Sequence, residues 1–146
     1  MKLYKAGAIA YMAWGALHVL VGGIPLFLFL KGPVDHALGA LLNKTYAADA
    51  IDPDIIATLS QHAFNLLAGG IAVFCIAFLN WRNDRTAYWI NLLLGGVLDL
   101  GFVMLVVIPG HIALSAGLPG PLIWLGGALM TTAGRRNASD AAPLPS

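Results

Sequence analysis

The chain has 146 residues, of which 59% are hydrophobic and only 10% charged, with a mean hydropathy of +0.79. A water-soluble domain usually carries about 25% charged residues, so this composition excludes an ordinary soluble fold and favours an integral membrane protein. The formal net charge of +1 gives no basic surface for nucleic acid. Cys75 is the single cysteine, which excludes an internal disulfide.

Four stretches are long and apolar enough to cross a bilayer, which takes about 20 residues each. They cover approximately residues 6–30, 55–80, 86–109 and 117–134. None shows the alternation of a barrel strand, so the sequence predicts an all-α polytopic membrane protein with a four-transmembrane-helix bundle over residues 1–136. The first uncharged run, residues 6–30, is too long for a typical signal-peptide core and predicts an uncleaved span.

Basic residues indicate the orientation of these four spans. The N-terminus, the 81–85 turn and the C-terminus would share one side, which carries six of the eight Lys and Arg residues. These are Lys2, Lys5, Arg82, Arg85, Arg135 and Arg136. The positive-inside rule therefore predicts a multi-pass protein of the cell membrane with both termini cytoplasmic.

The remaining segments lie outside the predicted membrane layer. In the outer linker, residues 31–54, "VDHALGALLNKTY" has a weak helical period and predicts a short surface helix. "IDPDII" indicates a helix start, with Asp52 as N-cap and Pro53 at the first position. The tail, residues 137–146, is small, polar and proline-containing, and we expect it to be disordered.

Each predicted span contains a Gly-Gly pair. The pairs are Gly22-Gly23, Gly69-Gly70, Gly95-Gly96 and Gly126-Gly127. Small residues let helix backbones approach closely in lipid, so these pairs predict helix–helix contacts.

Helical spacing gives each span a candidate inward face that combines small, polar and aromatic residues. On the first two spans the faces are Tyr11, Trp14, Gly15, His18, Gly22 and Pro25, and Thr58, Gln61, His62, Asn65, Gly69 and Ala72. On the last two they are Leu92, Gly95, Gly96, Asp99, Phe102 and Val106, and Gly120, Trp124, Gly127 and Thr131.

His18 and Asp99 are the candidate functional pair, because both lie roughly 17 to 18 Å into a layer about 30 Å thick. A charged Asp at this depth costs about 2.5 to 3.5 kcal/mol and usually faces a partner inside the bundle. His18 is the expected partner, and the two groups would titrate as a pair. His62 and Asn65, nearer the outer surface, would extend a polar path. Three alternatives stay open: a structural hydrogen bond, a ligand or substrate site, and passage of protons or ions.

The residue types favour a lipophilic pocket with a few convergent polar groups. Tyr11, Trp14, Phe102 and Trp124 would shape it around a quinone, sterol-like or isoprenoid molecule, with His62 and Asn65 also binding. If chemistry occurs, His18 and Asp99 would be the catalytic residues of an acid–base isomerisation or cyclisation. The alternative is a structural subunit that forms a homo-oligomer or packs against a membrane partner.

No sequence feature identifies a cofactor. A haem held by His18 and His62 is disfavoured because the two differ in depth by about 10 Å. A metal site would need three or four ligands that only a fortunate fold of the outer loops could assemble.

The four short spans, the "GALHVLVGG" segment around His18 and the Gly-rich later helices resemble small bacterial inner-membrane proteins of the DoxX-like kind. This resemblance implies the four-helix layout. It also implies a link to an oxidoreductase system, since some members are associated with quinone or thiosulfate oxidation. Asp99 and the outer linker have no counterpart in the pattern, so no site residue is carried over.

Overall fold

The computed structural model describes residues 1–42 and 51–140, with side chains to residue 137, and this part of the chain contains helices and turns but no strand. The predicted all-α class is therefore confirmed. The helices are α1 (Leu3–Lys31), α2 (Val34–Leu42), α3 (Pro53–Trp81), α4 (Arg85–Phe102), the π-helix η2 (Val103–Val107), α5 (Leu114–Gly117) and α6 (Pro119–Asp140).

Three of the described helical segments are long and apolar enough to cross a membrane: α1, α3, and α4 continued by η2 to Val107. They contain the first, second and most of the third predicted span. The fourth predicted span, 117–134, begins at the last residue of α5 and lies mostly in α6, which does not reach the same length of apolar sequence because Arg135 and Arg136 follow it. Crossing by α6 stays a prediction.

Local signals in the sequence set several helix ends. The Asp52 carboxylate accepts a hydrogen bond from the Asp54 backbone N–H at 2.8 Å, and Pro53 takes the first position of α3, as predicted. Asp84 caps α4 in the same way through the N–H of Ala87 at 2.7 Å. The predicted surface helix is confirmed over Val34–Leu42, and the rest of that segment lies outside the described residues.

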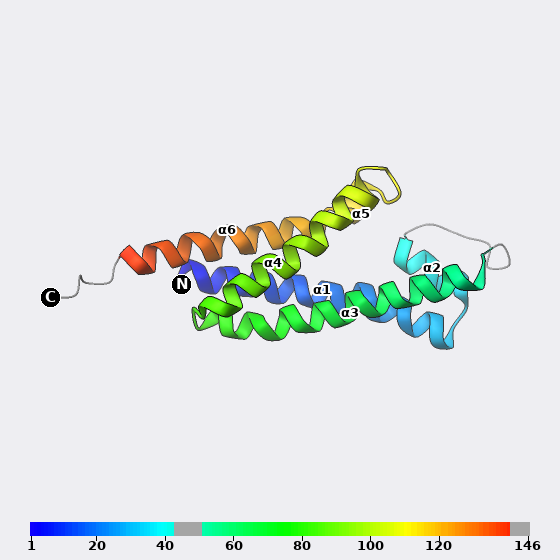
Figure 1. Ribbon diagram of the computed structural model, residues 1–146, viewed down its shortest axis with the longest axis horizontal. Coiled ribbons are helices and arrows are strands. Elements are labelled where there is room, and N and C mark those ends of the chain that lie inside the picture. Colours follow the sequence, from blue (N-terminus) through cyan, green and yellow to red (C-terminus); the bar gives the residue numbers. More distant parts are fainter. Residues whose placement is uncertain (43–50, 141–146) are drawn as a thin grey trace.

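The long helices pack side by side along one axis (Figure 1). α1 and α3 are antiparallel and in contact along most of their length, and α6 returns along α1. α4 touches α3 near the turn that joins them and then leans away from it toward α5. The N-terminus, the α3–α4 turn and the C-terminal end of α6 all lie at one end of the molecule (Figure 1).

At least one glycine of each pair lies at a helix contact, as the sequence predicts. A Cβ added at Gly70 would lie 2.8 Å from the carbonyl oxygen of Gly15, so these two helices meet backbone to backbone. Gly95 and Gly96 both face the indole of Trp124 on α6. Gly127 lies against Tyr11 on α1. Small residues therefore determine how closely the helices approach.

The inward face predicted for α3 is wrong, whereas that of α1 is correct. α1 buries Tyr11, Trp14, Gly15, Gly22 and Pro25. α3 instead buries its small residues against α1 and leaves the polar stripe exposed. The buried residues are Ala63, Gly70, Val73, Ala77 and Asn80, and the exposed ones are Thr58, Gln61, His62 and Asn65. Contact between small side chains outweighs burial of the polar stripe, because it lets the two backbones approach closely.

Two features were not expected from the sequence. The end of the third span is a π-helix, in which the N–H of Ile108 bonds the Val103 oxygen at 2.9 Å. Pro109 follows it and lacks an N–H for the usual helical bond to Leu105. α6 continues to Asp140, so residues 137–140 of the predicted disordered tail are helical; residues 141–146 lie outside the described part.

Candidate functional site

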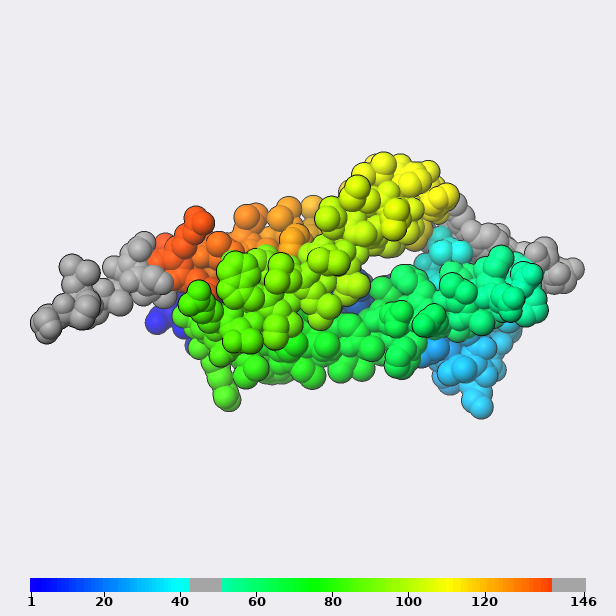
Figure 2. Space-filling view, viewed as in Figure 1, coloured from blue at the N-terminus to red at the C-terminus, as the bar shows by residue number. Residues whose placement is uncertain are grey.

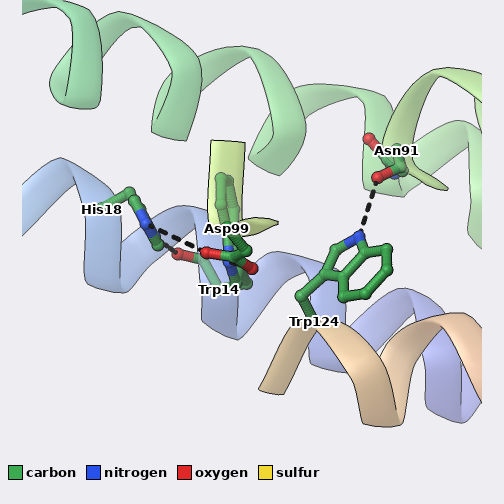
Figure 3. A network of polar contacts seen from close by, with 5 residues as sticks. All are labelled: Trp14, His18, Asn91, Asp99 and Trp124. Carbon is green, nitrogen blue, oxygen red and sulfur yellow. Dashed lines mark hydrogen bonds and ion pairs between the residues drawn. The ribbon is translucent and has the colours of Figure 1, made fainter. Parts of the chain in front are cut away.

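Asp99 on α4 is bound by Trp14 on α1, a partner that the sequence did not suggest. The indole Nε1 of Trp14 donates to Asp99 Oδ2 at 2.8 Å (Figure 3). Trp14 is fully buried and Asp99 is 4% exposed. A charge-assisted bond of this kind satisfies one oxygen of a carboxylate that would otherwise be costly to bury.

His18 lies one turn beyond Trp14 and completes the polar site. Its ring stacks on the Trp14 indole with centroids 3.7 Å apart, and its Nδ1 is 2.9 Å from the Trp14 carbonyl oxygen. The other ring nitrogen, Nε2, faces Asp99 Oδ1 at 4.0 Å (Figure 3). His18 and Asp99, which the sequence predicts at one depth, therefore lie next to each other. Their separation is too long for a direct hydrogen bond.

A cavity of about 580 Å³ adjoins this pair. It lies where α4, η2 and α5 stand away from α1 and α3, and the hollow between these segments is visible in the space-filling view (Figure 2). Its apolar wall includes Leu17, Leu41, Leu66, Leu98, Phe102 and Ile112. His18, His62 and Asp99 are the titratable residues in the described wall. The volume is within the usual range of small-molecule sites.

The residues predicted to bind a ligand are distributed unevenly around this cavity. His62 and Phe102 line it together with His18 and Asp99. Asn65 follows His62 on the same face of α3 but is exposed and outside the cavity wall. Tyr11 is fully buried in the core with Val73 and Ala77, away from the cavity.

Trp124 packs between α4 and α6 and does not line the cavity. Its indole covers Gly95 and Gly96, and its Nε1 donates to the Asn91 carbonyl oxygen at 3.4 Å (Figure 3). It instead borders a shallow groove of about 510 Å³ between these two helices. Apart from Asp99, the described lining of that groove is uncharged and mostly aliphatic.

Three contributors to the cavity were missed by sequence reasoning. Leu41 comes from α2, which the sequence suggested only as a surface helix, and Ile112 comes from the turn before α5. Gly120 was placed on an inward face but given no role. A Cβ there would lie 3.2 Å from His18 Cε1 and 3.8 Å from Asp99 Oδ1, so this glycine keeps the space before the pair open. The sequence feature that could have identified Gly120 is its position between two prolines.

Among the described residues, no group of three or more His, Cys, Asp or Glu side chains is arranged to hold a metal ion. His18, His62 and Asp99 share the cavity but do not form such a cluster. The chemistry that this arrangement offers is hydrogen bonding and proton transfer at one end of an apolar space.

No protein-family model matches the chain, and comparisons with curated proteins and with solved structures find no match either. What the site does must therefore follow from its own geometry.

Proposed function

We propose that this protein binds a lipophilic small molecule in the cavity beside His18 and Asp99. The observation that carries the proposal is the concentration of polar groups at one place in a wall that is otherwise apolar. Such a wall suits the hydrocarbon part of a quinone, sterol-like or isoprenoid molecule, and the polar pair suits an oxygen atom on that molecule.

The burial of Asp99 supports this proposal over a purely structural role. One carboxylate oxygen is satisfied by Trp14, but Oδ1 is directed toward His18 and the cavity without a hydrogen-bond partner among the described residues. A structural carboxylate would be expected to have both oxygens paired.

A second candidate is an enzyme that performs acid–base chemistry on such a molecule. The observation in its favour is that a carboxylate and an imidazole, 4.0 Å apart, both border the cavity. An isomerisation or cyclisation would need one group to remove a proton and the other to return it. A role within an oxidoreductase system, which the DoxX-like resemblance implies, belongs to the binding proposal and not to this enzyme.

Co-purification tests the binding proposal. The protein would be purified in mild detergent and its retained lipids identified by mass spectrometry, for wild type, His18→Ala and Asp99→Leu. His36→Ala is the matched control, because the His36 side chain is 69% exposed on α2 and lies outside the cavity wall.

We expect one lipophilic species in wild type and His36→Ala and its loss from both cavity variants at unchanged helicity. Retention of the species with loss of its conversion would indicate the enzyme. If no species is retained in any sample, or if Asp99→Leu lowers stability without changing retention, the binding proposal is wrong.

We further propose that α6 is a fourth span and that both termini are cytoplasmic in a bacterial inner membrane. Support comes from the shared end of the N-terminus, the α3–α4 turn and the end of α6, where most basic residues gather. In a Cys75→Ser background, an impermeant thiol reagent added to spheroplasts should label His111→Cys. It should label Arg82→Cys and Arg136→Cys only after permeabilisation. Labelling of Arg136→Cys from outside would mean that α6 does not cross.

A further inference from the structure

The polar end of the cavity consists of two atoms, His18 Nε2 and Asp99 Oδ1, and their hydrogen-bonding character can be worked out from their neighbours. The other atoms of the two groups are already engaged. His18 Nδ1 faces the Trp14 carbonyl, and Asp99 Oδ2 accepts from the Trp14 indole. Trp14 thus fixes both side chains from one position on α1.

The protonation of His18 follows from its contact with the Trp14 carbonyl oxygen. A carbonyl oxygen can only accept, so at 2.9 Å the proton must lie on Nδ1. In a neutral imidazole the second nitrogen then carries a lone pair, so Nε2 is an acceptor. It faces Oδ1 of a carboxylate, which is also an acceptor when ionised.

The separation of these two atoms leaves room for a bridging oxygen. They lie 4.0 Å apart, and an oxygen at about 2.8 Å from each, an ordinary hydrogen-bond length, fits between them on the cavity side. Gly120 leaves that space free, because any side chain there would approach both groups.

A hydroxyl suits this position in each protonation state of the pair, whereas a carbonyl does not. With no extra proton on the pair, a hydroxyl donates to one of the two acceptors. With one proton on either group, it donates to one group and accepts from the other. A carbonyl or an ether oxygen has no proton to donate and would face unpaired acceptors, which is costly in an apolar site.

From this geometry we infer that the ligand is a lipophilic alcohol whose hydroxyl group bridges His18 Nε2 and Asp99 Oδ1, with its hydrocarbon part against the apolar wall. This inference rests on the proposed function and names the chemical class that it takes. The class includes isoprenoid alcohols, sterols and quinols, which share the hydroxyl group.

Two matched sets of ligands test the inference on the intact protein in nanodiscs. The first set is farnesol, its methyl ether and farnesal; the second is cholesterol, its methyl ether and cholestenone. Each is titrated as a competitor against the radiolabelled alcohol of its set. In at least one set, we expect the alcohol to bind at least about tenfold more tightly than its ether and its carbonyl counterpart. This ratio corresponds to the loss of one good hydrogen bond.

Asp99→Asn should change how strongly the cavity prefers the alcohol rather than abolish binding. Trp14 still needs an acceptor, so the amide oxygen should face the indole and the amide NH₂ should face the cavity. The site would then offer a donor beside the Nε2 acceptor, so the carbonyl compound should bind at least about threefold more tightly than it binds wild type, while the alcohol can still bridge the two groups. His36→Ala, outside the cavity wall, should keep the wild-type ratio.

The outcomes distinguish failure of the alcohol inference from failure of the proposed function. Equal affinity for the three members of a set that binds would overturn the alcohol inference and leave the proposed function standing. Preference for the carbonyl compound by wild type would also overturn it, because a proton donor would then face the cavity. If neither skeleton binds, the proposed function itself fails for these ligand classes.

Discussion

The indole nitrogen of Trp14 lies 2.8 Å from Asp99 Oδ2, which connects the middle of α1 to the only carboxylate within α4. Both side chains are removed from solvent and joined across two helices, although the two residues lie 85 positions apart in sequence. The contact is therefore expected to stabilise the packing of α4 against α1 as well as to orient the carboxylate.

A double-mutant cycle measures that contribution. Trp14→Phe removes the donor and Asp99→Leu removes the acceptor, and we expect a coupling free energy of about 1.5 to 3 kcal/mol from unfolding in detergent, as for hydrogen bonds to charged groups. Trp89→Phe is the control for the change of ring, because Trp89 is 47% exposed and makes no hydrogen bond to Asp99. A coupling near zero would mean that the bond contributes nothing to stability.

The α1–α3 contact predicts that two adjacent glycines differ sharply in their tolerance of alanine. A Cβ at Gly70 would lie 2.8 Å from both the Gly15 carbonyl oxygen and the Val19 nitrogen, which are backbone atoms that cannot move aside. A Cβ at Gly69 would meet only the Leu98 side chain at 3.4 Å.

Gly70→Ala should therefore lower the unfolding free energy by about 1 to 3 kcal/mol through overpacking. Gly69→Ala should be neutral or slightly stabilising, because alanine has the higher helix propensity. Thermal unfolding followed by circular dichroism in one detergent compares the two. Equal losses would show that α1 and α3 do not meet at Gly70.

The arrangement of the helices shows where sequence reasoning succeeded and where it failed. Three of the four spanning lengths, the Asp52 cap, the closeness of His18 to Asp99 and the inward face of α1 follow from local signals, namely hydropathy, capping chemistry and rise per residue. The orientation of α3 does not, because its polar stripe and its small-residue stripe compete for burial. Only the partner helix decides between them, so Asn65 was misplaced.

The site was predicted in part. His18, Asp99 and Phe102 line the cavity, as their positions on their helical faces predict. His62 also lines it, although the inward face predicted for α3 is wrong. Trp14 as the hydrogen-bond donor and Trp124 as a cover for Gly95 and Gly96 depend on rotamers and on distances between helices. No periodicity encodes these quantities.

Gly120→Ala tests the cavity sterically and leaves its polar groups unchanged. In Gly120→Ala the new methyl group would lie 3.2 Å from His18 Cε1, in front of the polar pair. Gly101→Ala also places a methyl group in the cavity wall, but nothing lies within 4 Å of it. We expect Gly120→Ala to lower retention of the co-purified ligand at least about tenfold, the equivalent of about 1.4 kcal/mol, and Gly101→Ala to leave it within about twofold.

Similar retention by both alanine variants would argue that the ligand does not reach the His18–Asp99 pair. Circular dichroism of the two variants serves as the control for folding.

Replacement by phenylalanine should affect the unfolding free energy differently at Tyr11 and at Tyr88. The Tyr11 hydroxyl is buried without a hydrogen-bond partner among the described residues, whereas that of Tyr88 is 3.0 Å from Thr132 Oγ1. Tyr11→Phe removes an unpaired polar group and should leave the unfolding free energy unchanged or raise it by about 1 kcal/mol. Tyr88→Phe should lower it by about 0.5 to 1.5 kcal/mol. Unfolding of both variants in the same detergent gives the comparison.

A loss for Tyr11→Phe as large as that for Tyr88→Phe would contradict this prediction. It would indicate that the Tyr11 hydroxyl has a partner in the membrane-embedded protein. An internal water is the natural candidate, because Asn91 and Thr131 also bury polar atoms that lack a partner in the described structure. Water-to-protein magnetisation transfer to the Asn91 side-chain amide in NMR spectra would then identify it, and its absence would point to a protein partner instead.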